Sequence, residues 1–198
     1  MDINEIKNNI IKMAGMVSEI LDLVEKGFME HKMEFLNAAL NKEQVINGEE
    51  KALTQNILDL SRQAKGNLEE LSALAQAVEM LERMGDEAAG LIERIEIKIT
   101  EKLLFSEEGV TQFNETYKAM QGSIDMMKKF LLNKQPDLKK KILDNGFHVK
   151  FLVEHYRKEH ADRLVKGVCT PMGANMYFDM LDFTGNIARH ASNVAKLF

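Results

Sequence analysis

The chain has 198 residues, of which 45% are hydrophobic and 29% are charged, and its 26 Lys and Arg against 31 Asp and Glu give a formal net charge of −5. This apolar fraction is typical of a globular protein and excludes a disordered chain. With two prolines and long stretches of good helix formers, the sequence also excludes a β-sandwich or barrel, which needs turn residues about every 8–12 positions.

The acidic balance offers no attraction for the phosphates of a nucleic acid. No apolar run approaches the ~20 residues of a membrane span, and the N-terminus lacks the apolar core of a signal peptide. The single cysteine, Cys169, excludes an internal disulfide and a zinc-ligand motif. We therefore expect a cytoplasmic helical protein that binds no nucleic acid.

Apolar residues at helical spacing predict three helices in the first half of the chain. The first covers 6–40, with a bend near Gly27 and a break near Asn41. The second covers 45–66 and ends at a glycine that is a plausible C-cap. The third covers 68–103.

The second half repeats this plan with helices predicted over 107–133, 136–167 and 171–198. A serine cap precedes the fourth helix, and prolines begin the fifth and sixth. Three helices joined by short loops pack antiparallel. We therefore expect an all-α protein with two tandem three-helix bundles, 1–105 and 106–198, packed as one compact unit.

An internal repeat supports this duplication. Residues 80–88 align with residues 180–188 at an offset of 100, and four of the nine positions are identical. Two further positions are related: Glu82 with Asp182, and Asp86 with Asn186.

The first copy of the repeat carries an acidic pair, because Glu82 and Asp86 are four residues apart and share one face of a helix. Counted from a turn near Gly66, Glu49 and Glu50 of the preceding helix reach the same level. Converging carboxylates repel one another and need protons or a cation. Oxygen ligands suit hard ions, iron and manganese, and they tolerate zinc. The pattern predicts a carboxylate metal site; the alternative is a solvated helix face.

Gly85 lies between these two acids and costs roughly 1 kcal/mol relative to Ala inside a helix. The close approach of a neighbouring helix is one reason to retain it.

The second copy is weaker as a metal site, since Asn186 carries no charge. His155 and Glu159, four residues apart, offer ligands alongside Asp182. The alternative is a structural histidine that makes a hydrogen bond. The chain contains no Glu-x-x-His, no glycine-rich phosphate loop and no Gly-x-Ser-x-Gly. Cys169 has no motif that marks a nucleophile, so we expect no enzyme activity and no catalytic residue.

Three segments resemble the PhoU family of phosphate-uptake regulators. Residues 81–88, Leu-Glu-Arg-Met-Gly-Asp-Glu-Ala, are similar to the family signature Leu-Glu-Arg-Ile-Gly-Asp-His-Ala. Residues 45–49, Val-Ile-Asn-Gly-Glu, resemble the acidic element on the preceding helix of that family. Residues 160–169 are similar to a stretch in the PhoU-like tails of sodium/phosphate cotransporters. The likeness is that of a divergent member.

The resemblance implies two three-helix bundles with iron or zinc clusters at acidic pairs on facing helices. Carried over, Glu49, Glu82 and Asp86 would form the first metal site, and Asp182 alone would remain of a degenerate second site. The chain departs from the family pattern at these positions: Leu53 in the first site, and Gly146, Lys150 and Asn186 in the second.

The resemblance also implies a regulator of phosphate uptake and phosphate-starvation signalling. Such a protein acts by contact with a phosphate ABC transporter or a sodium/phosphate transporter and with a sensor histidine kinase. It meets the membrane only through these partners, and it forms a homodimer. Iron, zinc or manganese are the expected metals, with no other cofactor. A carboxylate-metal helical-bundle enzyme and a metal-free helical scaffold are the alternative functions.

Overall fold

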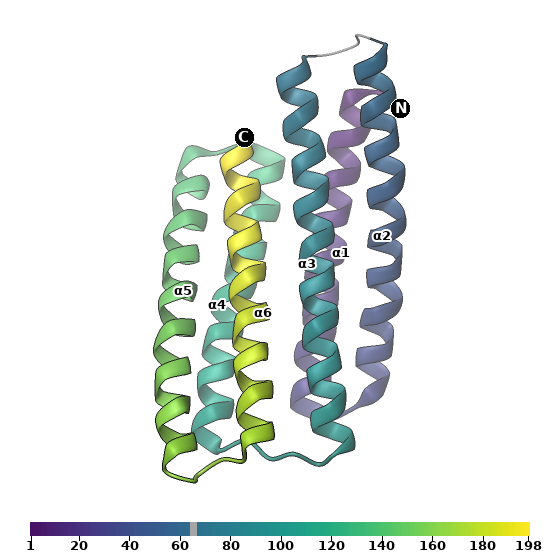
Figure 1. Cartoon of the computed structure of the whole chain (residues 1–198). Coiled ribbons are helices and arrows are strands. Elements are labelled where there is room, and N and C mark those ends of the chain that lie inside the picture. The colour runs from purple at the N-terminus through teal and green to yellow at the C-terminus, as the bar shows by residue number, and fades with distance from the viewer. Residues whose placement is uncertain (64–66) are drawn as a thin grey trace.

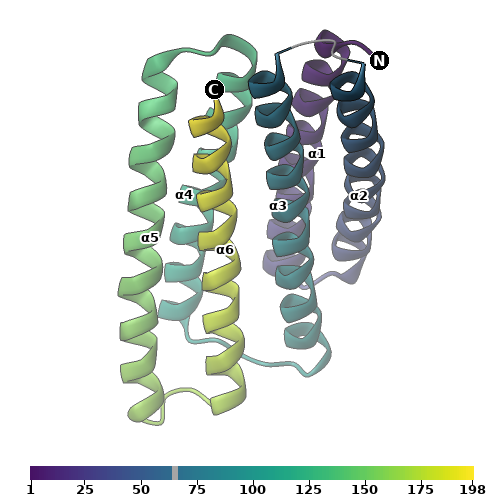
Figure 2. The ribbon, with the colours of Figure 1, turned by 45° about the horizontal axis from the view of Figure 1, so that its top comes forward.

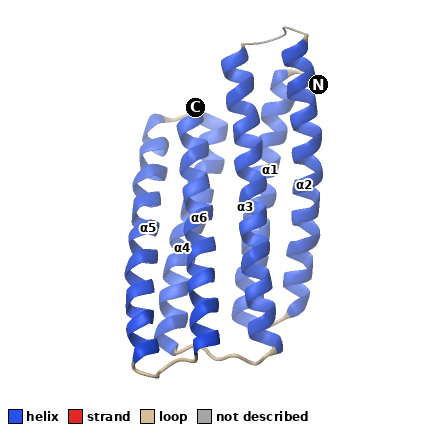
Figure 3. Cartoon of the chain, viewed as in Figure 1, coloured by secondary structure: helices blue, strands red, loops and turns tan. Residues whose placement is uncertain are grey.

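The computed structural model describes residues 1–63 and 67–198, and within these ranges it contains only helices (Figure 1, Figure 3). The all-α prediction is confirmed. The helices are α1 (Ile3–Glu30), α2 (Met33–Arg62), α3 (Leu68–Thr100), α4 (Glu107–Asn133), α5 (Pro136–Val165) and α6 (Pro171–Leu197).

The prediction of one helix over 6–40 is wrong. His31 adopts a left-handed conformation with φ of 55°, and the chain reverses there into α2. The apolar periodicity continues through the turn because α1 and α2 bury residues in the same core. The helix also runs unbroken through Gly27, where a Cβ would overlap the side chain of Leu36 on α2. Gly27 therefore admits the neighbouring helix and marks no break.

The other helix ends follow local signals in the sequence. The side chains of Ser106 and Thr170 accept hydrogen bonds from backbone N–H groups in the first turns of α4 and α6. Pro136 begins α5, as predicted. The predicted turn at Gly66 lies outside the described residues, and Asn67 caps the start of α3.

Helices α1–α3 form one bundle and α4–α6 a second bundle beside it (Figure 1, Figure 2). Helices α1 and α3 pack against α4 and α6, which leaves α2 and α5 on the outer sides. One continuous cluster of buried side chains extends through both bundles. The expected boundary between 1–105 and 106–198 falls in the connection before α4, and it stays a prediction.

Specific contacts join the two bundles. The hydroxyl of Tyr117 on α4 donates a 2.8 Å hydrogen bond to the carbonyl of Leu21 on α1. Arg94 of α3 pairs with Asp179 of α6 at 2.7 Å. The ring of Phe183 on α6 packs directly against Gly90 of α3. A Cβ at Gly90 would overlap this ring. None of the described helices combines the length and apolar character that crossing a membrane requires.

Candidate functional site

The acidic pair on α3 faces carboxylates of α2. Burial raises the pKa of Glu82, and the negative charges of Asp86, Glu50 and Glu43 raise it further. Glu43 and Glu50 are therefore the acids of α2 whose charges act on Glu82, and a metal site at these helices stays a prediction. Glu49 is partly buried and is not among the charges that shift this pKa.

Glu43 is the acidic residue that sequence reasoning missed. Its side chain is 8% exposed, and it accepts a 2.6 Å hydrogen bond from the amide of Asn47. Glu43 precedes buried Ile46 by three residues and Leu53 by ten, so it lies on the stripe that α2 turns toward the core. That spacing was the available signal.

The side chains, as they lie, do not form a metal centre. Among residues 1–63 and 67–198, no three His, Cys, Asp or Glu side chains come together closely enough to hold an ion. Part of the acceptor capacity is also used within α2, where Glu50 accepts a 2.9 Å hydrogen bond from Thr54. A metal at Glu49, Glu82 and Asp86 stays a prediction, and we derive no chemistry from it.

Gly85 lies where α3 meets α2, as expected, but the space there is not tight. A Cβ at this position would lie 3.7 Å from Cγ of Glu43 and 3.7 Å from Cγ2 of Ile46, which is ordinary van der Waals contact. An alanine fits at Gly85 without moving either neighbour.

In the second copy of the repeat, the acidic residue pairs with a cation, whereas in the first copy it lies near other acids. Asp182 on α6 forms a 2.6 Å ion pair with Arg157 of α5. The Arg157 guanidinium also lies over the ring of Phe178, 4.9 Å from its centroid. Asn186, at the position of Asp86, donates a 3.2 Å hydrogen bond to Glu87 of α3. A cation of this chain therefore neutralises the one acid that remained of the second site.

The expected grouping of His155, Glu159 and Asp182 does not occur in the described arrangement. His155 lies 3.3 Å from Glu159, and Glu159 accepts a hydrogen bond from Gln112 of α4. Asp182 instead faces Arg157. Glu159 thus connects α5 to α4, and His155 contacts Glu159 on its own helix.

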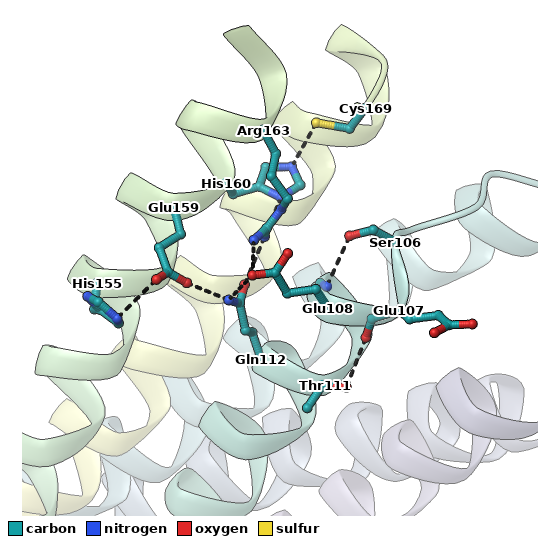
Figure 4. Close-up of polar contacts among 11 residues, drawn as sticks. Ser106, Glu107, Glu108, Thr111, Gln112, His155, Glu159, His160, Arg163 and Cys169 are labelled. Atoms are coloured by element: carbon teal, nitrogen blue, oxygen red, sulfur yellow. Dashed lines mark hydrogen bonds and ion pairs between the residues drawn. The ribbon is translucent and has the colours of Figure 1, made fainter. Parts of the chain in front are cut away.

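Buried polar side chains form a second cluster at the end of the second bundle (Figure 4). His160 is 2% exposed and stacks on the ring of Tyr177, with centroids 4.1 Å apart. Arg163 donates a 2.8 Å hydrogen bond to Gln112 and lies 3.1 Å from Nδ1 of His160. The thiol of Cys169 lies 3.7 Å from Nε2 of the same ring.

Burial and the charge of Arg163 lower the pKa of His160 to about 4. The imidazole is therefore neutral at pH 7 and has no positive charge with which to stabilise a thiolate at Cys169. The cluster ties α4, α5 and the connection to α6 together.

Known proteins resemble this chain in domain and in fold. The family model described as the PhoU domain matches residues 10–95, which cover most of the first bundle. Over residues 10–95 the chain is therefore similar to the PhoU family. A search of curated proteins found no match for this chain.

Two solved structures share the fold over nearly the whole length. PhoU from Pseudomonas aeruginosa superposes with a TM-score of 0.91 at 15% identity, covering 98% of this chain and 93% of that one. The phosphate transport system regulatory protein PhoU from Streptococcus pneumoniae gives 0.85 at 17% identity, covering 98% and 91%. At these identities the likeness shows a shared fold, which includes the second bundle.

Proposed function

We propose that this chain regulates phosphate transport through contacts with other proteins and without catalysing a reaction. The observation that carries the proposal is the PhoU domain match over residues 10–95. It gains support from the fold that the whole chain shares with a protein named as a phosphate transport regulator. The partners we propose are a phosphate ABC transporter or sodium/phosphate transporter and a sensor histidine kinase, met in the cytoplasm.

The long outer helices suit such a role, because α2 and α5 each leave one side free of the other helices of the chain. An amphipathic helix that packs on two neighbours presents its remaining face for recognition. The acidic face between α2 and α3, the Arg157–Asp182 pair and the cluster around His160 supply packing and charge to the fold.

Deletion of the gene in its own organism tests the proposal. During growth on excess phosphate, uptake of labelled phosphate should rise in the deletion strain and return to normal when the gene is restored. A strain deleted for the gene whose uptake and transporter expression match the parent at both low and high phosphate would contradict the proposal.

The partner proposal needs a separate measurement with purified proteins. The cytoplasmic subunit of the phosphate transporter and the cytoplasmic part of the sensor kinase are each titrated against the chain by calorimetry. Binding to either supports the contact, and binding to neither contradicts it. Sedimentation of the chain alone tests the proposed homodimer.

The regulatory proposal requires no metal. Elemental analysis of the untagged protein tests the separate proposal of iron, zinc or manganese at Glu49, Glu82 and Asp86. About one metal ion per chain, lost in a Glu82→Ala, Asp86→Ala double variant, would support it. A folded and empty protein would contradict it.

A further inference from the structure

The second bundle carries a groove at the place where the first bundle has its acidic face. The groove has a volume of about 810 Å³ and runs between α5 and α6, from Leu143 to Arg157 on one side and from Asp182 to Lys196 on the other. Fourteen residues of helix rise span about 20 Å. This length accommodates about four turns of another helix and far exceeds what a small anion needs.

The wall of the groove on α5 is apolar near Leu143 and Phe147, and further along it also carries Lys150, Glu154 and Arg157. Phe147 lines it and its side chain is 73% exposed, so a partner that covers this ring would bury apolar surface. Leu143, one turn earlier on the same helix, lines the groove beside it. Helix α5 approaches α6 closely at Gly146, because a Cβ at this position would overlap the hydroxyl of Ser192. Leu143 and Phe147 therefore lie beside this close contact of α5 and α6, and they offer anchor points for an amphipathic helix.

The rest of the groove is positively charged. Its two carboxylates are already paired within the chain, Asp182 with Arg157 at 2.6 Å and Glu154 with Lys150 at 3.7 Å. Two further cations line it, and neither forms an ion pair with a carboxylate of residues 1–63 or 67–198. Arg189 donates to the amide oxygen of Asn186, and the Lys196 ammonium donates to that of Asn193. In a chain of net charge −5, the groove is thus a local region of positive charge.

We propose that this groove binds an acidic amphipathic helix of a partner protein. The apolar stripe of that helix packs on Phe147 and Leu143, and its carboxylates pair with Arg189 and Lys196. Charge complementarity selects the partner and speeds its approach, while burial of the exposed ring supplies most of the affinity. The inference rests on the groove and not on the phosphate role, so either can fail without the other.

A synthetic peptide tests the proposal on the full-length protein. The probe is a fluorescein-labelled helix of about 18 residues built from Leu and Glu, with Leu at helical spacing on one face. Two control peptides have the same Leu and Glu content in scrambled order, or Lys in place of every Glu. Fluorescence anisotropy should show saturable binding of the probe alone, weakened by salt.

Substitutions in the protein then locate the binding. Phe147→Ala and Arg189→Glu should each weaken the probe at least about tenfold. Their matched controls should leave it unchanged. Phe151→Ala removes a ring of 60% exposure, one turn further along α5 and outside the groove lining. Lys51→Glu makes the same change of charge sign at an exposed position on α2.

Three outcomes would overturn the proposal. The first is the absence of binding by the acidic probe. The second is equal binding of the scrambled or lysine peptide, or equal loss in the control variants. The third is a dimer of the chain, seen by sedimentation and abolished by Phe147→Ala, which would make a second copy the occupant of the groove.

Discussion

The two bundles present opposite surfaces at equivalent places. Between α2 and α3, burial and the like charges around Glu82 raise its pKa. Between α5 and α6, the corresponding Asp182 has a cation at 2.6 Å, and the groove around it carries an excess of positive charge. A repeat of nine residues thus preserved the helix contacts while the charge between the helices changed sign. The charge of the exposed face can change while the buried contacts stay the same, because the two depend on different faces of the same helices.

The largest expected effect comes from acid, to which the two bundles respond in opposite ways. Unfolding returns His160 from a pKa of about 4 toward 6.5, so the unfolded chain binds the proton first. Stability is therefore lost as the pH falls from 6.5 to 4, by about 3 kcal/mol for this group when titration is complete. Urea unfolding at about pH 7 and pH 4.5 should show a smaller loss in His160→Gln than in the wild type.

His155→Gln is the matched control, because His155 is half exposed on the same helix. It should follow the wild type at both pH values. A pH dependence of His160→Gln that equals that of the wild type would show that His160 does not govern the acid sensitivity.

The contact between the bundles gives the next largest effect. Gly90→Ala would place a Cβ 2.6 Å from the ring of Phe183, so α3 and α6 must separate or the ring must move. We expect a loss of about 2 kcal/mol in the free energy of unfolding, measured in urea. Gly48→Ala is the control, since nothing lies within 4 Å of the new methyl group, and it should stabilise the protein. A gain in both variants would contradict the tight contact.

Gly85 and Gly185, which occupy equivalent positions of the repeat, compare how tightly α3 packs on α2 and α6 packs on α5. Gly85→Ala should stabilise the protein by about 1 kcal/mol, because its methyl group fits and the helix gains propensity. In Gly185→Ala the methyl group would lie 3.2 Å from Cγ2 of Val153, so we expect a smaller gain. Thermal unfolding of both variants measures the difference. Equal gains would show that α5 and α6 are packed no more tightly than α2 and α3.

The smallest effect should come from the acidic face itself. Because the pKa of Glu82 is raised, the folded state binds this proton more tightly than the unfolded chain does. The ionised form therefore costs stability at pH 7, and the cost disappears as the pH falls below that pKa. Glu82→Gln should gain about 0.5 kcal/mol at pH 7 and nothing in acid. Urea unfolding measures both values.

Asp144→Asn, a neutralisation at an exposed position on α5, controls for the change in net charge. The same gain in both variants would show that overall charge, and not the crowding around Glu82, is responsible.

The candidate site shows how far sequence reasoning reached. The register counted from the turn placed acids of α2 opposite Glu82, and Glu50 does raise its pKa. A count from the turn gives the level of a residue but not its rotation, and one residue turns a helix side chain by about 100°. Glu43 is found only when the apolar spacing of α2 is added to that count. Arg157 was missed for a related reason: its pairing with Asp182 depends on how α5 is rotated against α6.

By itself, the sequence determined the helical class, most helix ends and the duplication into two bundles. These features depend on local chemistry, since caps, prolines and apolar spacing act within a few residues. Only the tertiary structure decided that the chain reverses at His31, that Phe183 packs on Gly90, and that cations surround Asp182. Those outcomes depend on the rotation and crossing of helices far apart in the chain, which the packing of the shared core sets.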